Sequence, residues 1–121
     1  MARGNLIAES VRVGGSVGVA LTVEKVYRVE AGDKTVGQPR VWTFIAFEVA
    51  DDDAERLADA LSEALDPAGG WYCDFRTMEE TFVVFGARIF RYRRGDQAAR
   101  ADAEAYARSA GVPEGQIDWS E

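Results

Sequence analysis

Two segments of alternating apolar and polar residues predict β-strands in the first half of the chain. Apolar side chains fall at every second position through much of 17–30, whereas 41–50 is apolar on both alternating faces. A period of two places side chains on one face of a strand. The intervening residues, 31–39, include two glycines and a proline, so an antiparallel hairpin is expected. Because both of its faces are apolar, 41–50 is expected near the centre of the sheet.

The first residues, 1–16, have a weaker pattern. The apolar residues that would form a short strand there, ended by a pair of glycines, are Leu6, Ile7, Val11 and Val13. We therefore interpret 1–16 as a possible short extra strand, outside the elements that the pattern defines.

Two segments with apolar residues three and four positions apart predict α-helices. The first lies between the acidic run 51–53 and Pro67, and Asp52 with Glu55 has the spacing of a capping box. The second begins after Asp96, which is expected to be its N-cap, and its apolar stripe is mostly alanine. Each helix therefore has one face suited to packing against a sheet.

Three shorter strands are expected at 71–76, 81–85 and 88–93. The pair Gly86-Ala87 is expected to form a type II′ turn in which Gly86 supplies the positive φ. The element order ββαβββα indicates an α+β fold, with a mostly antiparallel sheet of about five strands and both helices on one face. A chain of 121 residues is expected to form a single globular domain, 1–121.

Charge and composition narrow the range of functions. The net charge is −7, which disfavours binding to nucleic acid. No apolar run approaches the length of a membrane span, and the first residues lack the apolar core of a signal peptide. Cys73 is the only cysteine, so no internal disulfide can form, and its apolar neighbours suggest a buried thiol. These features predict a cytoplasmic protein with no membrane or nucleic-acid partner.

The chain contains no histidine, which removes the usual acid–base group and the commonest metal ligand. Helix capping explains the acidic run 51–53 better than a cation site does, because the run lacks the ligand spacing of a calcium loop. The glycine-rich segment 13–18 precedes a strand rather than a helix, so it does not match a phosphate-binding loop. We therefore expect no metal, no cofactor and no catalytic residue, although an enzyme is not excluded.

The segment Gly69 to Tyr92 carries the best candidate binding residues. Tyr72, Asp74 and Arg76 share one strand face, and Trp71 precedes them. Arg88 and Arg91 belong to the one basic concentration on this acidic chain, and arginine beside aromatic residues suits carboxylate, phosphate or protein recognition. The competing interpretations are ion pairs inside the protein, including pairs with acids of the second helix, and tryptophans that only pack in the core.

Several landmarks of the second half resemble small uncharacterised bacterial proteins of about this length. They are the segments Trp71 to Phe75, Phe82 to Phe85, Phe90 to Tyr92, Gly111 to Pro113 and Gln116 to Trp119. The resemblance covers about residues 69–119. It implies a single-domain bacterial protein of the cytoplasm, and it implies no activity, site or substrate.

The interpretation favoured by these residues is a small non-catalytic binding domain. Its partner would be another protein or a small anionic ligand, held by Trp71, Tyr72, Asp74, Arg76, Arg88 and Arg91. A narrower version is an acidic immunity-type inhibitor of a basic toxin. The alternatives are a small-ligand-binding protein, or a histidine-independent enzyme that uses Asp74, Tyr72 and Arg76. A homodimer joined through a sheet edge or exposed aromatic residues is a further interpretation.

Overall fold

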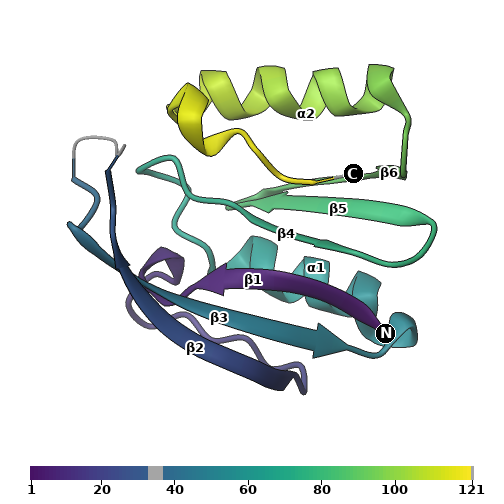
Figure 1. Ribbon diagram of the computed structural model, residues 1–121, viewed down its shortest axis with the longest axis horizontal. Helices are drawn as coiled ribbons and strands as arrows, with labels where there is room; N and C mark the ends of the chain where they lie inside the picture. Colours follow the sequence, from purple (N-terminus) through teal and green to yellow (C-terminus); the bar gives the residue numbers. More distant parts are fainter. Residues whose placement is uncertain (33–36, 121) are drawn as a thin grey trace.

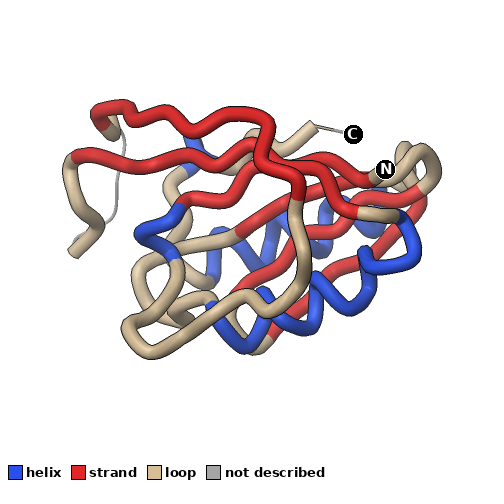
Figure 2. Tube along the Cα trace, turned by 90° about the horizontal axis from the view of Figure 1, so that it is seen from below, coloured by secondary structure: helices blue, strands red, loops and turns tan. Residues whose placement is uncertain are grey.

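The computed structural model describes residues 1–32 and 37–120, which form one antiparallel sheet and two α-helices (Figure 1 and Figure 2). The strands are β1 (Ala2–Ile7), β2 (Thr22–Glu30), β3 (Val41–Val49), β4 (Cys73–Arg76), β5 (Glu80–Phe85) and β6 (Arg88–Arg93), and the helices are α1 (Ala54–Ala64) and α2 (Gln97–Ser109). Short 3₁₀ turns lie at η1 (Ala8–Ser10), η2 (Asp51–Asp53) and η3 (Glu114–Gln116). The strand order is β2-β3-β1-β4-β5-β6. The expected α+β class and antiparallel pairing are confirmed.

The sheet has six strands rather than about five, because the N-terminal segment forms a strand at its centre. β1 pairs with β3 on one side and with β4 on the other. On the face of β1 toward α1, Ala2, Gly4 and Leu6 follow one another, and Leu6 is the one large apolar side chain among them. The opposite face carries the polar residues Arg3 and Asn5. The possible short strand expected within 1–16 is therefore present, but it covers Ala2–Ile7 and leaves out Val11 and Val13.

Gly4 allows the two halves of the sheet to meet across β1. A Cβ at this position would lie 2.4 Å from the Asp74 carbonyl oxygen and 2.6 Å from the Phe75 Cβ. The rings of Phe47 and Phe75, whose residues flank Gly4 in the ladder, approach to a centroid distance of 6.2 Å. Two large rings therefore pack where a side chain on β1 would otherwise stand.

The two helices lie on opposite faces of the sheet, which corrects the expectation of one shared face (Figure 1). Phe82 and Val84 of β5 belong to the buried cluster that contains the leucines of α1. Val83 and Phe85 belong to a second cluster, which contains the alanines of α2. A strand that is apolar on both faces needs cover on both sides, so one helix packs against each.

Of the two N-terminal helix caps expected from the sequence, the one at α2 is confirmed and the one at α1 is wrong. The Asp96 side chain accepts a hydrogen bond from the Ala99 amide at 3.0 Å, as expected of an N-cap. At α1 the N-cap is Asp53 rather than Asp52, and its side chain pairs with Arg56 at 2.9 Å instead of capping the helix. The expected capping box is therefore wrong.

The β5–β6 turn differs from the type II′ turn expected at Gly86-Ala87. The positive φ, 67°, belongs to Ala87 and not to Gly86. Gly86 is needed for a different reason, because a Cβ there would lie 2.7 Å from the Leu65 carbonyl oxygen. The glycine thus permits close approach of the chain that follows α1.

The Glu9 side chain links η1 to β3, the strand between β2 and β1 in the sheet. Its carboxylate accepts hydrogen bonds from the Thr43 amide at 2.6 Å and from the Thr43 hydroxyl at 2.9 Å. Partial burial raises the pKa of Glu9, but these hydrogen bonds outweigh it and hold the pKa below its ordinary value of 4.5. The contact fixes the turn that follows β1.

Replacing Gly4 by alanine should lower the free energy of unfolding by about 2–3 kcal/mol, because the new Cβ meets backbone in the sheet centre. Gly18→Ala is the matched control, since nothing lies within 4 Å of a Cβ there and its φ is not left-handed. Urea denaturation measures both variants. Equal stability of the two would contradict the close packing around β1.

Replacing Glu9 by glutamine should remove about 1 kcal/mol of stability near neutral pH, since the partly exposed carboxylate accepts charge-assisted hydrogen bonds. The folded-state pKa is lowered, so the stabilisation is present above 4.5 and disappears as pH falls through the folded value. Urea denaturation at a series of pH values should show the two proteins converging in acid. A difference that stays constant with pH would refute this role of Glu9.

Candidate functional site

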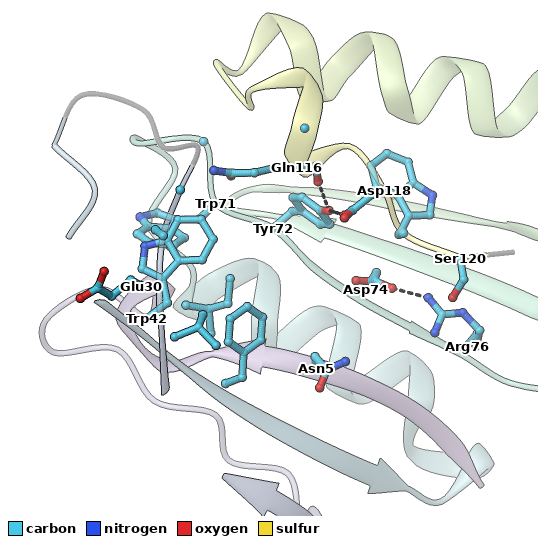
Figure 3. Close-up of a pocket in the computed structure, with 18 residues that line it drawn as sticks. Asn5, Glu30, Trp42, Trp71, Tyr72, Asp74, Arg76, Gln116, Asp118 and Ser120 are labelled. Carbon is cyan, nitrogen blue, oxygen red and sulfur yellow. Dashed lines mark hydrogen bonds and ion pairs between the residues drawn. The ribbon is translucent and has the colours of Figure 1, made fainter. Parts of the chain in front are cut away.

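A groove of about 460 Å³ opens on the face of the sheet that α2 only partly covers (Figure 3). The buried cluster of α2 takes in side chains of β5 and β6, whereas the groove follows β4, β1 and β3. One wall is formed by residues 29–32, at the end of β2 and directly after it, and the other is the C-terminal segment 115–120. The volume is in the range of small-ligand sites, roughly 300–1,000 Å³.

Aromatic rings form one end of the groove. Trp42 and Trp71 lie together there, with ring centroids 5.3 Å apart and planes tilted by 60° (Figure 3). Phe44 adjoins Trp42 at 6.3 Å and stacks on Tyr27 at 5.1 Å. The Trp42 indole donates to the Pro39 carbonyl at 2.9 Å, which fixes its ring. Trp42 and Trp71 are only 7% and 8% exposed, so they are mostly packed in the core, and this end offers an occupant a small part of each ring.

The turn before β4 brings Trp71 into this position. Gly69 and Gly70 both have positive φ, 91° and 71°, which a residue with a side chain adopts at a cost. The Gln38 side-chain amide donates to the Gly69 carbonyl at 2.6 Å and joins the turn to the loop before β3. The aromatic end is thus built by two loops that are distant in sequence.

Polar groups form the other end of the groove. Asp74 and Arg76, two positions apart on β4, point to the same face and form an ion pair (Figure 3). Asn5 of β1 stands opposite Asp74 in the ladder. The Tyr72 hydroxyl donates to the Gln116 carbonyl and lies 3.3 Å from a carboxylate oxygen of Asp118. The sheet and the C-terminal segment therefore meet through these side chains.

Burial shifts the pKa values of two side chains in the groove, Asp74 and Tyr72. It raises the pKa of the Asp74 carboxyl, the nearby Asp118 carboxylate adds to that effect, and the Arg76 guanidinium opposes it. Burial, with the charges of Asp74 and Asp118, also raises the pKa of Tyr72, so the phenol stays neutral. Tyr72 is thus a hydrogen-bond donor that holds the C-terminal segment in place.

One nitrogen of Arg76 is notable. Its Nε is buried and has no hydrogen-bond partner within the residues that the structure describes. A buried donor without an acceptor costs free energy, and this nitrogen is too deeply buried to contact an occupant of the groove. The polar end therefore presents the carboxylates of Asp74 and Asp118 and the remaining nitrogens of Arg76.

Cys73 lies on the opposite face from these groups, as its place between Tyr72 and Asp74 requires. It is 1% exposed and belongs to the cluster beneath α1. Burial raises the pKa of its thiol, and the sulfur lies 3.3 Å from the Asn5 carbonyl oxygen. The expected structural thiol is confirmed, and a nucleophilic role is disfavoured.

The structure divides the six predicted binding residues among three places. Trp71, Tyr72, Asp74 and Arg76 all line the groove. Arg88 instead lies over the Phe90 ring at 4.6 Å, in a shallow hollow beside α2. Arg91 pairs with Glu80 at 2.8 Å and with Glu55 of α1 at 3.2 Å. Arg91 thus pairs within the protein, but with the first helix rather than the second.

Sequence reasoning missed several residues of the groove. Asn5 was hidden in the ambiguous N-terminal segment, and Phe44 was assigned only to a strand. Asp118 has a usable signal in the sequence, because it lies between the apolar residues Ile117 and Trp119, which favour packing of this segment on the domain. Trp119 is 3% exposed, and its indole donates to the Tyr92 hydroxyl at 2.9 Å. The packed tail therefore carries Asp118 to the groove.

Comparisons with protein-family models, with curated proteins and with solved structures each found no match. Across residues 1–32 and 37–120, no group of three or more histidine, cysteine, aspartate or glutamate side chains is placed to hold a metal ion. None of the described helices combines the length and apolar character that crossing a membrane requires. The chemistry of the groove is therefore the basis for a functional proposal.

Replacing Arg76 by methionine should lower the free energy of unfolding by about 2–3 kcal/mol near neutral pH, because Asp74 would remain as a buried carboxylate without its cation. The pKa of Asp74 would then rise further above its ordinary value of 3.8. A carboxyl whose folded-state pKa exceeds its unfolded one destabilises the fold as pH rises between the two values. The deficit, measured by urea denaturation, should therefore grow from acid to neutral pH.

The double variant Asp74→Asn/Arg76→Met is the control for this prediction. It removes both charges, so its deficit should change little with pH. A deficit of Arg76→Met that is the same in acid and at neutral pH would show that Asp74 is not held by this ion pair.

Proposed function

We propose that the protein is a non-catalytic interaction domain that binds a basic side chain of a partner protein in the groove. The observation that carries the proposal is the combination of aromatic side chains and Glu30 at one end with Asp118 at the other (Figure 3). Cations are attracted both to aromatic faces and to carboxylates, so the two ends favour the same kind of occupant.

The charge of the groove favours a cation over the small anionic ligand expected from the sequence. Among the described lining residues, Glu30, Asp74 and Asp118 are acidic and Arg76 is basic. Asp74 and Arg76 neutralise each other through their ion pair, which leaves two carboxylates. An anion would also have to approach a chain of net charge −7.

The charge of the whole domain favours a partner protein as the source of the cation, because the chain carries a net charge of −7. A basic partner protein would also be attracted over a distance by the acidic domain.

A second candidate is an enzyme that uses Asp74 as a general acid. The observation in its favour is that Asp74 lies in a groove rather than on a flat surface, with its pKa raised by burial. The neighbouring groups fit this role less well, because Arg76 pairs with Asp74 and the Tyr72 hydroxyl is engaged with the C-terminal segment. We therefore place the binding domain first.

Titration with N-acetyl-arginine amide should change the tryptophan fluorescence, because tryptophans line the groove. An occupant of this size is expected to bind with a dissociation constant of about 0.1–1 mM. The citrulline analogue, which is neutral and nearly the same shape, should bind much more weakly. Agmatine, a guanidinium without carbonyls, separates a free-amine site from a peptide site.

Asp118→Asn should weaken binding of the arginine probe about fivefold, because one of the two unneutralised carboxylates is lost. Asp59→Asn is the matched control, since Asp59 is exposed on α1, on the other face of the sheet. If the citrulline probe binds as tightly as the arginine probe, or if Asp118→Asn has no effect, the groove is not a cation site.

A further inference from the structure

The strand β6 forms one border of the sheet, and its outer edge is accessible. It stands last in the strand order and pairs only with β5 among the described strands. Arg88 and Arg91 are exposed, and the residues between them, Ile89 and Phe90, are half-buried. The first half of β6 is therefore open to solvent, and an open strand edge is a template for another strand.

The alternation of hydrogen bonds identifies the main-chain groups that point outward from β6. The Arg94 amide donates to the Glu79 carbonyl at 2.8 Å, so these two residues form a hydrogen-bonded pair. Bonded and non-bonded pairs alternate along an antiparallel ladder. Counting back from Arg94 by twos places Ile89 and Arg91 between the bonded pairs, with amides and carbonyls that point away from β5. These groups are the hydrogen-bonding positions that a further strand would use.

A hollow between β6 and α2 adjoins this edge and holds an arginine without a carboxylate partner. The Arg88 guanidinium lies over the Phe90 ring at 4.6 Å and over the Tyr106 ring of α2 at 5.5 Å. Asp102 also lines the hollow, but Arg88 forms no ion pair with it or with any other described carboxylate. The rings therefore position a cation whose N–H groups can bind an incoming carboxylate.

The charges of β6 decide which kind of strand can pair there. The strand carries Arg88, Arg91 and Arg93 and no acidic residue. Arg91 is already paired with Glu80 and Glu55. Arg88 and Arg93 form no ion pair with the carboxylates that the structure describes. A second copy of β6 would set arginines against arginines, whereas a strand with carboxylates at the facing positions would neutralise both cations.

We propose that the outer edge of β6 accepts an extended acidic segment of a partner protein as a further strand of the sheet. The main chains of Ile89 and Arg91 form the ladder, and Arg88 and Arg93 each pair with a carboxylate of the segment. The two carboxylates lie five residues apart, as Arg88 and Arg93 do on β6. This inference is independent of the groove, which follows β4, β1 and β3.

The probe for the test is the acetylated and amidated hexapeptide Glu-Thr-Val-Val-Thr-Glu. Its sequence is the same in both directions, so a glutamate faces each of the two arginines whichever way the peptide lies. In a two-dimensional amide NMR titration, shifts should concentrate at Ile89 and Arg91, and hydrogen exchange of both amides should slow about tenfold or more at saturation. Replacing both glutamates by glutamine should weaken binding about tenfold or more.

N-methylation of the peptide tests the strand pairing separately from the charges. In this register the amide of the first valine points toward β6, and the amide of the second valine points away from it. Methylating the first should weaken binding about tenfold or more, whereas methylating the second should change it less than about twofold. Equal binding of the two methylated peptides would show that the arginines attract carboxylates without forming a strand, and would overturn the proposal.

The protein variant Arg88→Gln should weaken binding of the hexapeptide about fivefold, because one of the facing ion pairs is lost. Arg28→Gln is the matched control, since it removes the same charge from β2 at the other border of the sheet. The amide spectrum of each variant without peptide shows whether it is folded. An equal loss of binding in both folded variants, or no binding to the natural chain at about 5 mM peptide, would also overturn the proposal.

Discussion

The insertion of β1 between β3 and β4 is the constraint on which the rest of the structure depends. Without it, the hairpin of β2 and β3 would have no ladder to the hairpins of β4, β5 and β6. Gly4 makes the insertion possible, because a side chain there would collide with Asp74 and Phe75. The same strand supplies Asn5 and Ile7 to the groove, so the central pairing also builds the site.

The groove exists because the two faces of the sheet are covered unequally. α1 packs against the large apolar cluster on one face, whereas the cluster of α2 on the other face is smaller. The uncovered part of that second face is walled by the returning C-terminal segment. The bond from the Trp119 indole to the Tyr92 hydroxyl anchors this segment, and Tyr72 binds it near Asp118. The acidic side chain of Asp118 thereby stands at the polar end of the groove, opposite the aromatic end (Figure 3).

Local periodicity predicted those parts of the fold that depend on neighbours in sequence. The bounds of β6, the N-cap at Asp96 and the shared face of Tyr72, Asp74 and Arg76 all follow from short-range spacing. The central place of β1 could not be predicted from this spacing, because the glycine and the polar residues of the strand leave it without a clear apolar pattern. The two apolar faces of β5 did indicate cover on both sides, but which helix covers which face depends on long-range packing.

The separation of Arg88 and Arg91 from the groove has the same cause. Alternation shows that they point to opposite faces of β6, but the partner on each face is set by the helix that packs there. A face shared within one strand is therefore a safer guide to a site than an arginine cluster spread over a turn.

The most direct test of the groove as a cation site is a two-dimensional amide NMR titration with N-acetyl-arginine amide. The account predicts shifts concentrated at Asn5, Trp42, Trp71 and Asp118, with the amides of α1 unchanged. Shifts confined to the hollow around Arg88, or no shifts at concentrations well above about 1 mM, would contradict it.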